Sequence, residues 1–476
     1  MEKAYELTRC FTFCLQNGGS TRTKKASTKI ALDRATNLLQ GRRTEVITNY
    51  PEFEKARKLA VQVKDHTLEN LDYYLEQFTA AAEASGAIVH FAETPDEATG
   101  IVVDICKARE AKTATRVKSM LGEEIGLPGA LAAAGIERVE TDLAEHIIQL
   151  AGERPSHIVI PALHKTQEEV ADLFTDKHTR QRSSDTVEAL VESARYELRP
   201  KYISADVGIS GANFLAADSG SVLTVTNEGN AELTTALPPC HIVTVGIEKL
   251  VPSLEHTAVF LRLLSRSALG SEFTQYVTFF NGPKRSGDRD GPEEMHIVLV
   301  DNRRTSMLGG DMAKMLRCIR CGACMNHCPV YSVIGGHPYG STYPGPMGSI
   351  LTPALNSLGQ AGDLPNACTL NGRCREVCPV DIPLPDMMRA LRERQWREKT
   401  GNQRTRWIMI AWAYFALRPW LYRLAVKLAL PTLRLFKGKN NRLKQAPFAT
   451  SWTKDRDLTL PGKKSFTAQW HAGKRS

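Results

Sequence analysis

The stretch "AIVHFAETPDEATGIVVDICKAREAKTATRVK", from Ala87 to Lys118, decides the fold of the larger part of the chain. Residues 87–92 form a short apolar run that predicts a strand, residues 95–111 have the spacing of a helix, and residues 113–118 predict a second strand. Strands separated by helices of this length are typical of a largely parallel sheet. The stretch therefore predicts an α/β domain.

The same alternation continues on both sides of this stretch. Residues 29–86 have apolar side chains at near-helical spacing and end at Gly86, so we expect helices before the first strand. Between residues 206 and 245, β-branched runs cut by Gly and Asn predict hairpin strands laid onto the sheet. The other expected elements are strands over 136–142, 157–163, 241–248 and 295–302, helices over 129–135 and 253–266, and a loop over 281–294.

A second, smaller module is expected from residue 304, and its chemistry is set by cysteines. The stretch "RCIRCGACMNHCPVY" (317–331) has the spacing CxxCxxCxxxCP. Thiolates separated by two residues can bind one iron–sulfur cube, while the fourth, before proline, serves a neighbouring cube. A zinc site needs only four ligands and usually takes them as pairs of CxxC, so zinc is disfavoured. The cysteines of this stretch are Cys318, Cys321, Cys324 and Cys328.

The second half of the cysteine motif, "ACTLNGRCREVCP" (367–379), has Asn371 where the middle cysteine belongs. Because the fourth cysteine of each half serves the other cube, the first cube is complete and the second lacks one thiolate. Asn371 or water could ligate the fourth iron, the iron could be lost to leave a three-iron cluster, or the site could be empty. We expect an assembled but altered second cluster, since its thiols would otherwise be idle. The expected ligands are Cys318, Cys321, Cys324 and Cys378 for the first cluster, and Cys328, Cys368 and Cys374 for the second.

Two further groups of residues are expected not to bind metal. His337, in the Gly/Pro-rich loop between the halves, is expected to be structural because the thiolates already account for the metal. The scattered cysteines are expected to be ordinary reduced thiols. They are Cys10, Cys14, Cys106 and Cys240.

Composition and charge bear on the location of the chain. No apolar run reaches the ~18 residues that span a bilayer, and the first residues have no secretory pattern, so we expect a cytoplasmic protein. From Gly401 onward the chain has sixteen lysines and arginines against two acids. The apolar run Trp407 to Leu417 within this basic tail predicts a helix that lies on anionic lipid or docks on a partner subunit. Nucleic-acid binding is disfavoured, because no recognised fold accompanies the charge.

Several long motifs together resemble one family. The chain is similar, over roughly residues 45 to 430, to the iron–sulfur subunit of the bacterial L-lactate utilization system, the LutB family. The resemblance implies a LUD domain, related to sugar-phosphate isomerase and CoA-transferase folds, and two partners: a cysteine-rich redox subunit and a smaller LUD protein. It also implies oxidation of L-lactate to pyruvate, and a cysteine in the family where this chain has Asn371. The motifs are "ADVGISGANFLAADSGSVLTVTNEGNAELTTALP", "PSHIVIPALHK", "DGPEEMHIVLVDN", "LRCIRCGACMNHCPVY" and "GGHPYGSTYPGPMG".

Three stretches of the α/β domain could line a pocket. Each also has a plain explanation, as helix-terminal charges, turn residues or caps. Neither a Ser-His-Asp order, a P-loop nor a dinucleotide fingerprint after a strand is found, so the chain has no recognisable hydride acceptor. The candidates are Lys118, Ser119, Glu123 and Glu124 in "VKSMLGEEIGL", Asn227, Glu228 and Asn230 in "TNEGNAE", and Asp218, Ser219 and Ser221 in "ADSGS".

These observations predict an α/β LUD domain followed by a mainly α-helical, two-cluster ferredoxin-type module. The expected parts are an N-terminal extension (1–45, mobile), a helical lead-in with the LUD domain (46–303), the iron–sulfur module (304–398) and the basic tail (399–476). The expected function is electron transfer within a complex that oxidises L-lactate. The alternative is a LUD-domain enzyme that acts on a carboxylate or CoA-linked substrate, with the clusters in a regulatory role.

Overall fold

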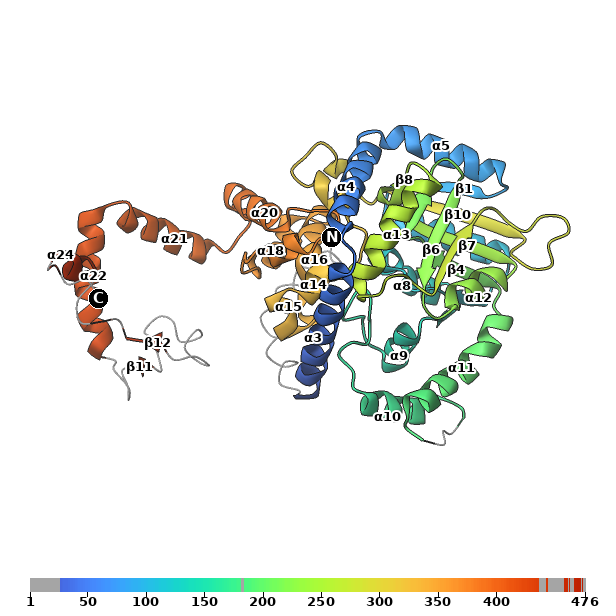
Figure 1. Cartoon of the computed structure of the whole chain (residues 1–476), viewed down its shortest axis with the longest axis horizontal. Helices are drawn as coiled ribbons and strands as arrows, with labels where there is room; N and C mark the ends of the chain where they lie inside the picture. The colour runs from blue at the N-terminus through green and yellow to red at the C-terminus, as the bar shows by residue number, and fades with distance from the viewer. Residues whose placement is uncertain are drawn as a thin grey trace. The chain divides into compact units, whose positions relative to one another are not determined.

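A computed structural model of the chain describes residues 26–180, 184–435, 442–443, 458–460, 462, 466–471 and 473. The expectations for Cys10, Cys14 and most of the last forty residues lie outside this part of the chain. The structure divides into a unit that ends at Arg397 and a second unit from Glu398 onward. Figure 1 shows the elements of both units.

A six-stranded sheet lies at the centre of the first unit. Its order is β1-β10-β7-β4-β2-β3, and every neighbouring pair is parallel, which confirms the predicted α/β class. Alternate side chains of β7 and β10 face opposite sides, so that Ile242 and Val298 join one buried cluster while Val243 and Ile297 join another. The strands are β1 (Ile88–Ala92), β2 (Thr113–Arg116), β3 (Glu137–Glu140), β4 (Val207–Gly211), β7 (Cys240–Gly246) and β10 (Glu294–Val300).

The expected hairpin is present, but it belongs to a second sheet. Strands β5 and β6 are antiparallel, and with β8 and β9 they form a four-stranded sheet of order β8-β5-β6-β9. Its buried side chains, Leu215 and Val222 among them, pack in the same cluster as one face of the central sheet. The strands are β5 (Phe214–Ala216), β6 (Ser221–Thr226), β8 (Leu250–Val251) and β9 (Tyr276–Phe280).

The strand predicted over residues 157–163 is wrong. Nδ1 of His157 accepts the backbone N–H groups of Val159 and Ile160, at 3.0 Å each, and the N–H of Ser156 donates to the carbonyl of Pro161 at 3.0 Å. These bonds close the segment on itself, so its backbone groups cannot join a sheet ladder. The apolar run forms a loop beside the cysteine module instead.

Helices pack around the two sheets and include the expected helices of the α/β part. α6 begins where the Thr94 hydroxyl accepts the N–H of Glu97 and Pro95 takes the first helical turn. These helices are α5 (Leu71–Ala84), α6 (Pro95–Ala108), α7 (Met120–Glu124), α8 (Leu127–Ala133), α9 (Leu143–Ala151), α10 (Gln167–Lys177), α11 (Val187–Ile203), α12 (Asn230–Ala236), the 3-10 turn η2 (Ile247–Lys249) and α13 (Leu254–Ala268).

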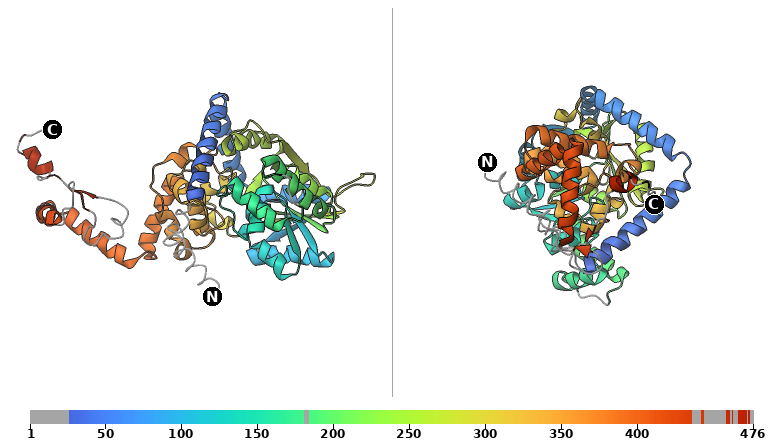
Figure 2. Two further views of the ribbon diagram at one scale, coloured as in Figure 1. Left: turned by 90° about the horizontal axis from the view of Figure 1, so that it is seen from below. Right: turned by 90° about the vertical axis from the view of Figure 1, so that its left-hand side faces the viewer.

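Two N-terminal helices, α3 (Ala26–Thr48) and α4 (Phe53–Glu69), lie between the α/β part and the cysteine module (Figures 1 and 2). Leu32 and Leu39 of α3 are buried in the same hydrophobic cluster as Phe260 of α13 and Met325 of the module. The module therefore shares a core with the α/β part. The predicted boundary at residue 45 falls within α3, and the predicted domain limits stay predictions.

The cysteine module consists of short helices joined by turns. It ends in the expected closing helix, α20 (Leu384–Glu398). Its other elements are η3 (Thr305–Met307), η4 (Ala313–Arg317), α14 (Ala323–Asn326), α15 (Pro329–Ile334), η5 (His337–Tyr339), α16 (Gly345–Leu355), α17 (Leu358–Ala361), α18 (Asp363–Asn366) and α19 (Arg373–Glu376).

The described part of the second unit contains helices with exposed apolar side chains. α21 (Gln403–Ala416) includes most of the run in which a helix was predicted, and none of its residues is buried. Trp407 is 69% exposed and Trp420, in α22 (Pro419–Leu435), is 66% exposed. Within the described residues, no helix is both long and apolar enough to cross a membrane. The other elements of this unit are β11 (Arg442–Leu443), β12 (Leu458–Thr459) and α24 (Phe466–His471).

Candidate metal centre and adjoining cavity

The four thiols predicted for the first cluster line one small cavity of about 20 Å³. Cys318 follows η4, and Cys321 and Cys324 lie on either side of Gly322, where α14 begins. Cys378 lies sixty residues after Cys318 in the sequence and follows α19. Apolar side chains complete the wall of the cavity. They belong to Ile158, Ile319, Met347, Val380, Ile382 and Leu384.

The donor set of this cavity fits an iron–sulfur cluster. Burial, together with the neighbouring thiols Cys378 and Cys318, raises the pKa of Cys321 to about 12. Thiols in an apolar wall have few strong partners, whereas bound cationic iron deprotonates thiols outright. The N–H of Ile382 donates to Sγ of Cys378 at 3.4 Å, a contact of the kind that tunes the potential of a cluster.

Three thiols form the second set. Burial and the proximity of Cys368 and Cys328 raise the pKa of Cys374 to about 12. Backbone N–H groups point at two of these sulfurs, because Tyr331 donates to Cys328 at 3.5 Å and Leu370 donates to Cys368 at 3.3 Å. The structure places these three thiols near one another, and their role as ligands of a second cluster stays a prediction.

Asn371, at the position of the missing cysteine, is exposed and is used locally. Its side-chain oxygen accepts the N–H of Arg373 at 3.3 Å, a turn contact common for asparagine. The preceding residue, Leu370, has a φ of 56°, in the left-handed region that few non-glycine residues adopt. The chain therefore turns sharply at the altered ligand position.

Arginines of α3 and α4 hold the backbone around the first set of thiols. Arg43 donates to the carbonyl of Val377 at 2.9 Å, and Arg57 donates to the carbonyl of Cys378 at 2.8 Å. Arg57 also pairs with Asp381 at 2.9 Å. Both arginines place positive charge near the sulfur atoms, which stabilises a cluster in its more negative state.

A cavity of about 370 Å³ lies at the carboxyl ends of three neighbouring strands, β2, β4 and β7. Ligands of open α/β sheets bind at such an edge. Arg320, between Cys318 and Cys321 in the sequence, also lines the cavity, so the cavity adjoins the first set of thiols. Its volume is that of a small-molecule site.

A buried ion network closes the side of the cavity that faces the module. Glu248 accepts from Arg304 at 2.5 Å and from Arg320 at 3.2 Å. Arg304 also binds both oxygens of Glu124, at 2.9 and 3.0 Å, and Glu124 accepts the hydroxyl of Tyr343 at 2.6 Å. Burial would raise the pKa of Glu248, but Arg304, Arg320 and Lys249 outweigh it and hold that pKa at about 2. The network links the sheet edge to the cysteine motif.

Gly246, at the end of β7, permits this arrangement. A Cβ at this position would lie 2.1 Å from a carboxylate oxygen of Glu248 and 2.8 Å from Nε of Arg304. Only a glycine lets the carboxylate fold back against the end of its own strand.

The structure brings together half of the pocket residues named from the sequence. Glu124 belongs to the ion network, Glu123 pairs with Arg116, and Asp218 accepts the N–H of Leu254 at the start of α13 at 3.1 Å. The candidates that line the cavity are Lys118, Ser119, Asn227, Glu228 and Asn230. Those that do not are Glu123, Glu124, Asp218, Ser219 and Ser221.

Sequence reasoning missed Lys249, Arg304 and Arg320, all of which line the cavity. The sequence position of Lys249 and Arg320 could have revealed them. "GIEKL" comes at the end of a buried apolar run, and "CIRC" has an arginine between two cysteines. Side chains that follow parallel strands gather at one edge.

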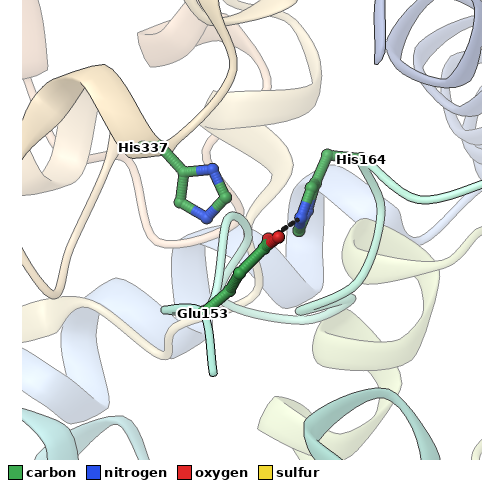
Figure 3. A group of neighbouring side chains, drawn as sticks. All are labelled: Glu153, His164 and His337. Atoms are coloured by element: carbon green, nitrogen blue, oxygen red, sulfur yellow. Dashed lines mark hydrogen bonds and ion pairs between the residues drawn. The ribbon is translucent and has the colours of Figure 1, made fainter. Parts of the chain in front are cut away.

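Glu153, His164 and His337 form a third polar group (Figure 3), with possible ligand atoms within 4.8 Å of one another. Two histidines and a carboxylate can bind a divalent metal. Here Glu153 accepts from His164 at 2.8 Å and from Lys165 at 2.7 Å, while His337 contacts the carbonyl of Arg154 at 2.6 Å. The ammonium group of Lys165 already balances the carboxylate, so these contacts support the structural role expected of His337.

Comparisons with known proteins agree with this two-part site. Residues 75–300 match the LUD domain model and residues 314–382 match the 4Fe-4S dicluster domain model. The chain is 43% identical over 440 residues to lactate utilization protein B of Lysinibacillus sphaericus, with 92% of each chain covered. It is 44% identical over 430 residues to the protein of the same name from Geobacillus kaustophilus, covering 89% of this chain and 90% of that protein.

A structural comparison gives a much weaker likeness. The crystal structure of a DUF162 family protein from Deinococcus radiodurans matches with a TM-score of 0.28 and 13% sequence identity. The match covers 48% of this chain and 98% of that one. Likeness at this level supports no conclusion about function.

Proposed function

The chain belongs to the lactate utilization protein B family, and on that premise we propose that it is the electron-transfer subunit of a complex that oxidises L-lactate to pyruvate. L-Lactate loses two electrons and two protons in this reaction. The chain would take these electrons from a substrate-oxidising partner and pass them to an acceptor. The family membership and the 4Fe-4S dicluster domain give it an iron–sulfur role in lactate utilization.

The observation that carries the proposal is the assembly of two sets of buried and half-buried thiols within one compact unit. We assign the cavity-lining set to a [4Fe-4S] cluster and the second set to an altered cluster that lacks a thiolate at Asn371. The bound clusters would supply reversible one-electron transfer. The ligands are Cys318, Cys321, Cys324 and Cys378 for the first cluster, and Cys328, Cys368 and Cys374 for the second.

The rest of the chain protects and positions this centre. The apolar wall of the first cavity excludes water, which would otherwise hydrolyse the cluster and change its potential. Backbone N–H groups donate to Cys378, Cys328 and Cys368, and Arg43 and Arg57 fix the turns that present the thiols. These contacts are formed by the folded chain before any partner binds.

The partners that we propose are a cysteine-rich redox subunit and a small LUD-domain subunit. Neither nucleic acid nor a nucleotide cofactor is expected. Because α21 and α22 expose tryptophans within a basic tail, we also propose peripheral contact with anionic lipid. Flotation with anionic liposomes should carry the full chain and leave behind a chain that ends at Glu398; equal flotation would remove the lipid proposal.

The decisive experiment is anaerobic reconstitution with the two partner subunits. Addition of L-lactate should bleach the visible absorbance of the clusters only when the partners are present. Turnover of a carboxylate or CoA-linked acid by this chain alone would instead favour the alternative, a LUD-domain enzyme. The sheet-edge cavity is the observation that keeps this alternative open.

A further inference from the structure

Lys249 stands apart from the other cations of the sheet-edge cavity. Its side chain lines the cavity, is 9% exposed, and has no hydrogen bond or ion pair with any residue that the structure describes. The two neighbouring carboxylates are engaged elsewhere, since Glu248 binds Arg304 and Arg320 while Glu124 binds Arg304 and Tyr343. A buried ammonium group without a partner is costly. The cavity thus offers a positive charge that forms no ion pair with the residues the structure describes.

The surrounding chemistry points to an anionic ligand. Lys118, the other cation of the lining outside the ion network, donates to the carbonyl of Val159 at 2.5 Å and interacts electrostatically with Glu228, so Lys249 alone remains available to a ligand. The acids of the lining outside the ion network, Asp142 and Glu228, follow β3 and β6. β7 and β3 are separated by two strands, so their ends lie roughly 14 Å apart at the usual strand spacing. An anionic group is therefore favoured at the Lys249 end and disfavoured at the other.

The position of the site indicates what a bound anion would affect. Lys249 lies close enough to Cys318 for the two groups to interact electrostatically, and Arg320 both lines the cavity and stands between two of the thiols. A ligand on Lys249 would therefore lie beside the first set of thiols. A change in ligand charge would be felt by a cluster bound there.

We propose that this cavity binds a small monocarboxylic acid, whose carboxylate pairs with Lys249 beside the first set of thiols. The choice of a carboxylate over a phosphate rests on the proposed function, which supplies 2-hydroxy and 2-oxo acids as substrate and product. A charge-assisted hydrogen bond in a buried site accounts for the expected strength of the contact.

The test is calorimetric titration of the anaerobic, cluster-loaded chain with L-lactate, pyruvate or inorganic phosphate. K249M should weaken binding of the acids by about tenfold to a hundredfold, the usual effect of losing a hydrogen bond to a charged group. K249R keeps the charge and should bind within a few fold of the unsubstituted chain. K107M, which removes an exposed lysine on α6, is the matched control and should bind normally. Iron content and the urea midpoint of each variant establish that it has folded.

Two results would overturn the proposal: no binding of either acid to the unsubstituted chain, or equal binding by K249M. Tighter binding of inorganic phosphate than of both acids would reject the carboxylate assignment. The electron-transfer function is judged separately, by reduction of the clusters in the presence of the partners. If K249M binds no acid but its clusters are still reduced by lactate with the partners present, both proposals stand. If the chain never binds an acid yet its clusters are reduced, the proposal of a carboxylate site at Lys249 is overturned and the electron-transfer proposal stands.

Discussion

Removal of the charge at Glu248 should destabilise the first unit severely. In E248Q the amide cannot replace the carboxylate that Arg304 and Arg320 share, so two buried guanidinium groups lose a common counter-charge. The side chain of Glu248 is only 3% exposed, so water cannot screen the change. The effect should reach the cysteine module, because Arg320 lies within its motif.

The expected loss of unfolding free energy in E248Q can be worked out in two ways. A pKa of about 2, against an ordinary 4.5, corresponds to about 3 kcal/mol in favour of the ionised form at neutral pH. Breaking a buried pair by removing one partner typically costs about 3–5 kcal/mol. Because the folded-state pKa is lowered, this contribution is complete above pH 4.5 and is lost as the pH falls toward 2. The measurement therefore belongs at pH 7.

The assay is anaerobic urea unfolding, followed by circular dichroism and by the absorbance of the clusters. The control is E137Q, which breaks the exposed pair of Glu137 with Lys201 at 2.7 Å. Glu137 is 56% exposed, so its loss should change the unfolding free energy by about 0–1 kcal/mol. A change in E248Q of less than about 1 kcal/mol, equal to that in the control, would refute the reasoning about the ion network.

Three further outcomes are expected. C378S should remove the EPR signal of the intact four-iron cluster and C374S should not; loss of the same signal in both variants would contradict the division of the thiols. N371C should raise the iron content and convert the altered second cluster to an ordinary four-iron one, whereas unchanged iron and EPR would mean that this turn cannot present a ligand. His146 is buried beside His178 at 3.2 Å, and burial lowers its pKa to about 4. The unfolded chain therefore binds a proton that the folded chain does not between pH 6.5 and 4, so stability falls as the pH drops, by up to about 1.4 kcal/mol per unit. H146L should lessen this decline when unfolding is measured at pH 7, 6 and 5, and parallel profiles for the two proteins would contradict the explanation.

Local sequence predicted the centre of the sheet well, because β7 and β10 are buried on both faces. Runs such as "HIVTVGIE" and "MHIVLVDN" are mostly apolar, and β7 and β10 lie where these runs stand. The same reasoning failed at "HIVIPAL", where the ring of His157 captures two backbone N–H groups and closes a loop. Periodicity does not reveal a side chain that competes with a ladder for backbone hydrogen bonds.

The cavity was only half predictable for a related reason. Lys118 and Ser119 follow β2 and were recognisable as residues at the end of a strand. Lys249 joins them because β7 lies next to β4, and β4 next to β2, an order that adjacent sequence does not specify. Arg304 and Arg320 line the cavity because the cysteine module packs against the sheet edge.

By itself, the sequence determined the α/β class, the two half-motifs of thiols and the asparagine that stands where the second half-motif lacks a cysteine, since each depends on the type and spacing of neighbouring residues. The spacing rule also grouped Cys378 with Cys318, Cys321 and Cys324. The tertiary structure decided that this set adjoins a cavity lined by Lys249, which has no hydrogen bond or ion pair within the part of the chain that the structure describes. The physical reason is that the meeting of cavity and thiols depends on contacts between residues far apart in the chain. A shared hydrophobic core and buried ion pairs enforce those contacts, and residue spacing cannot.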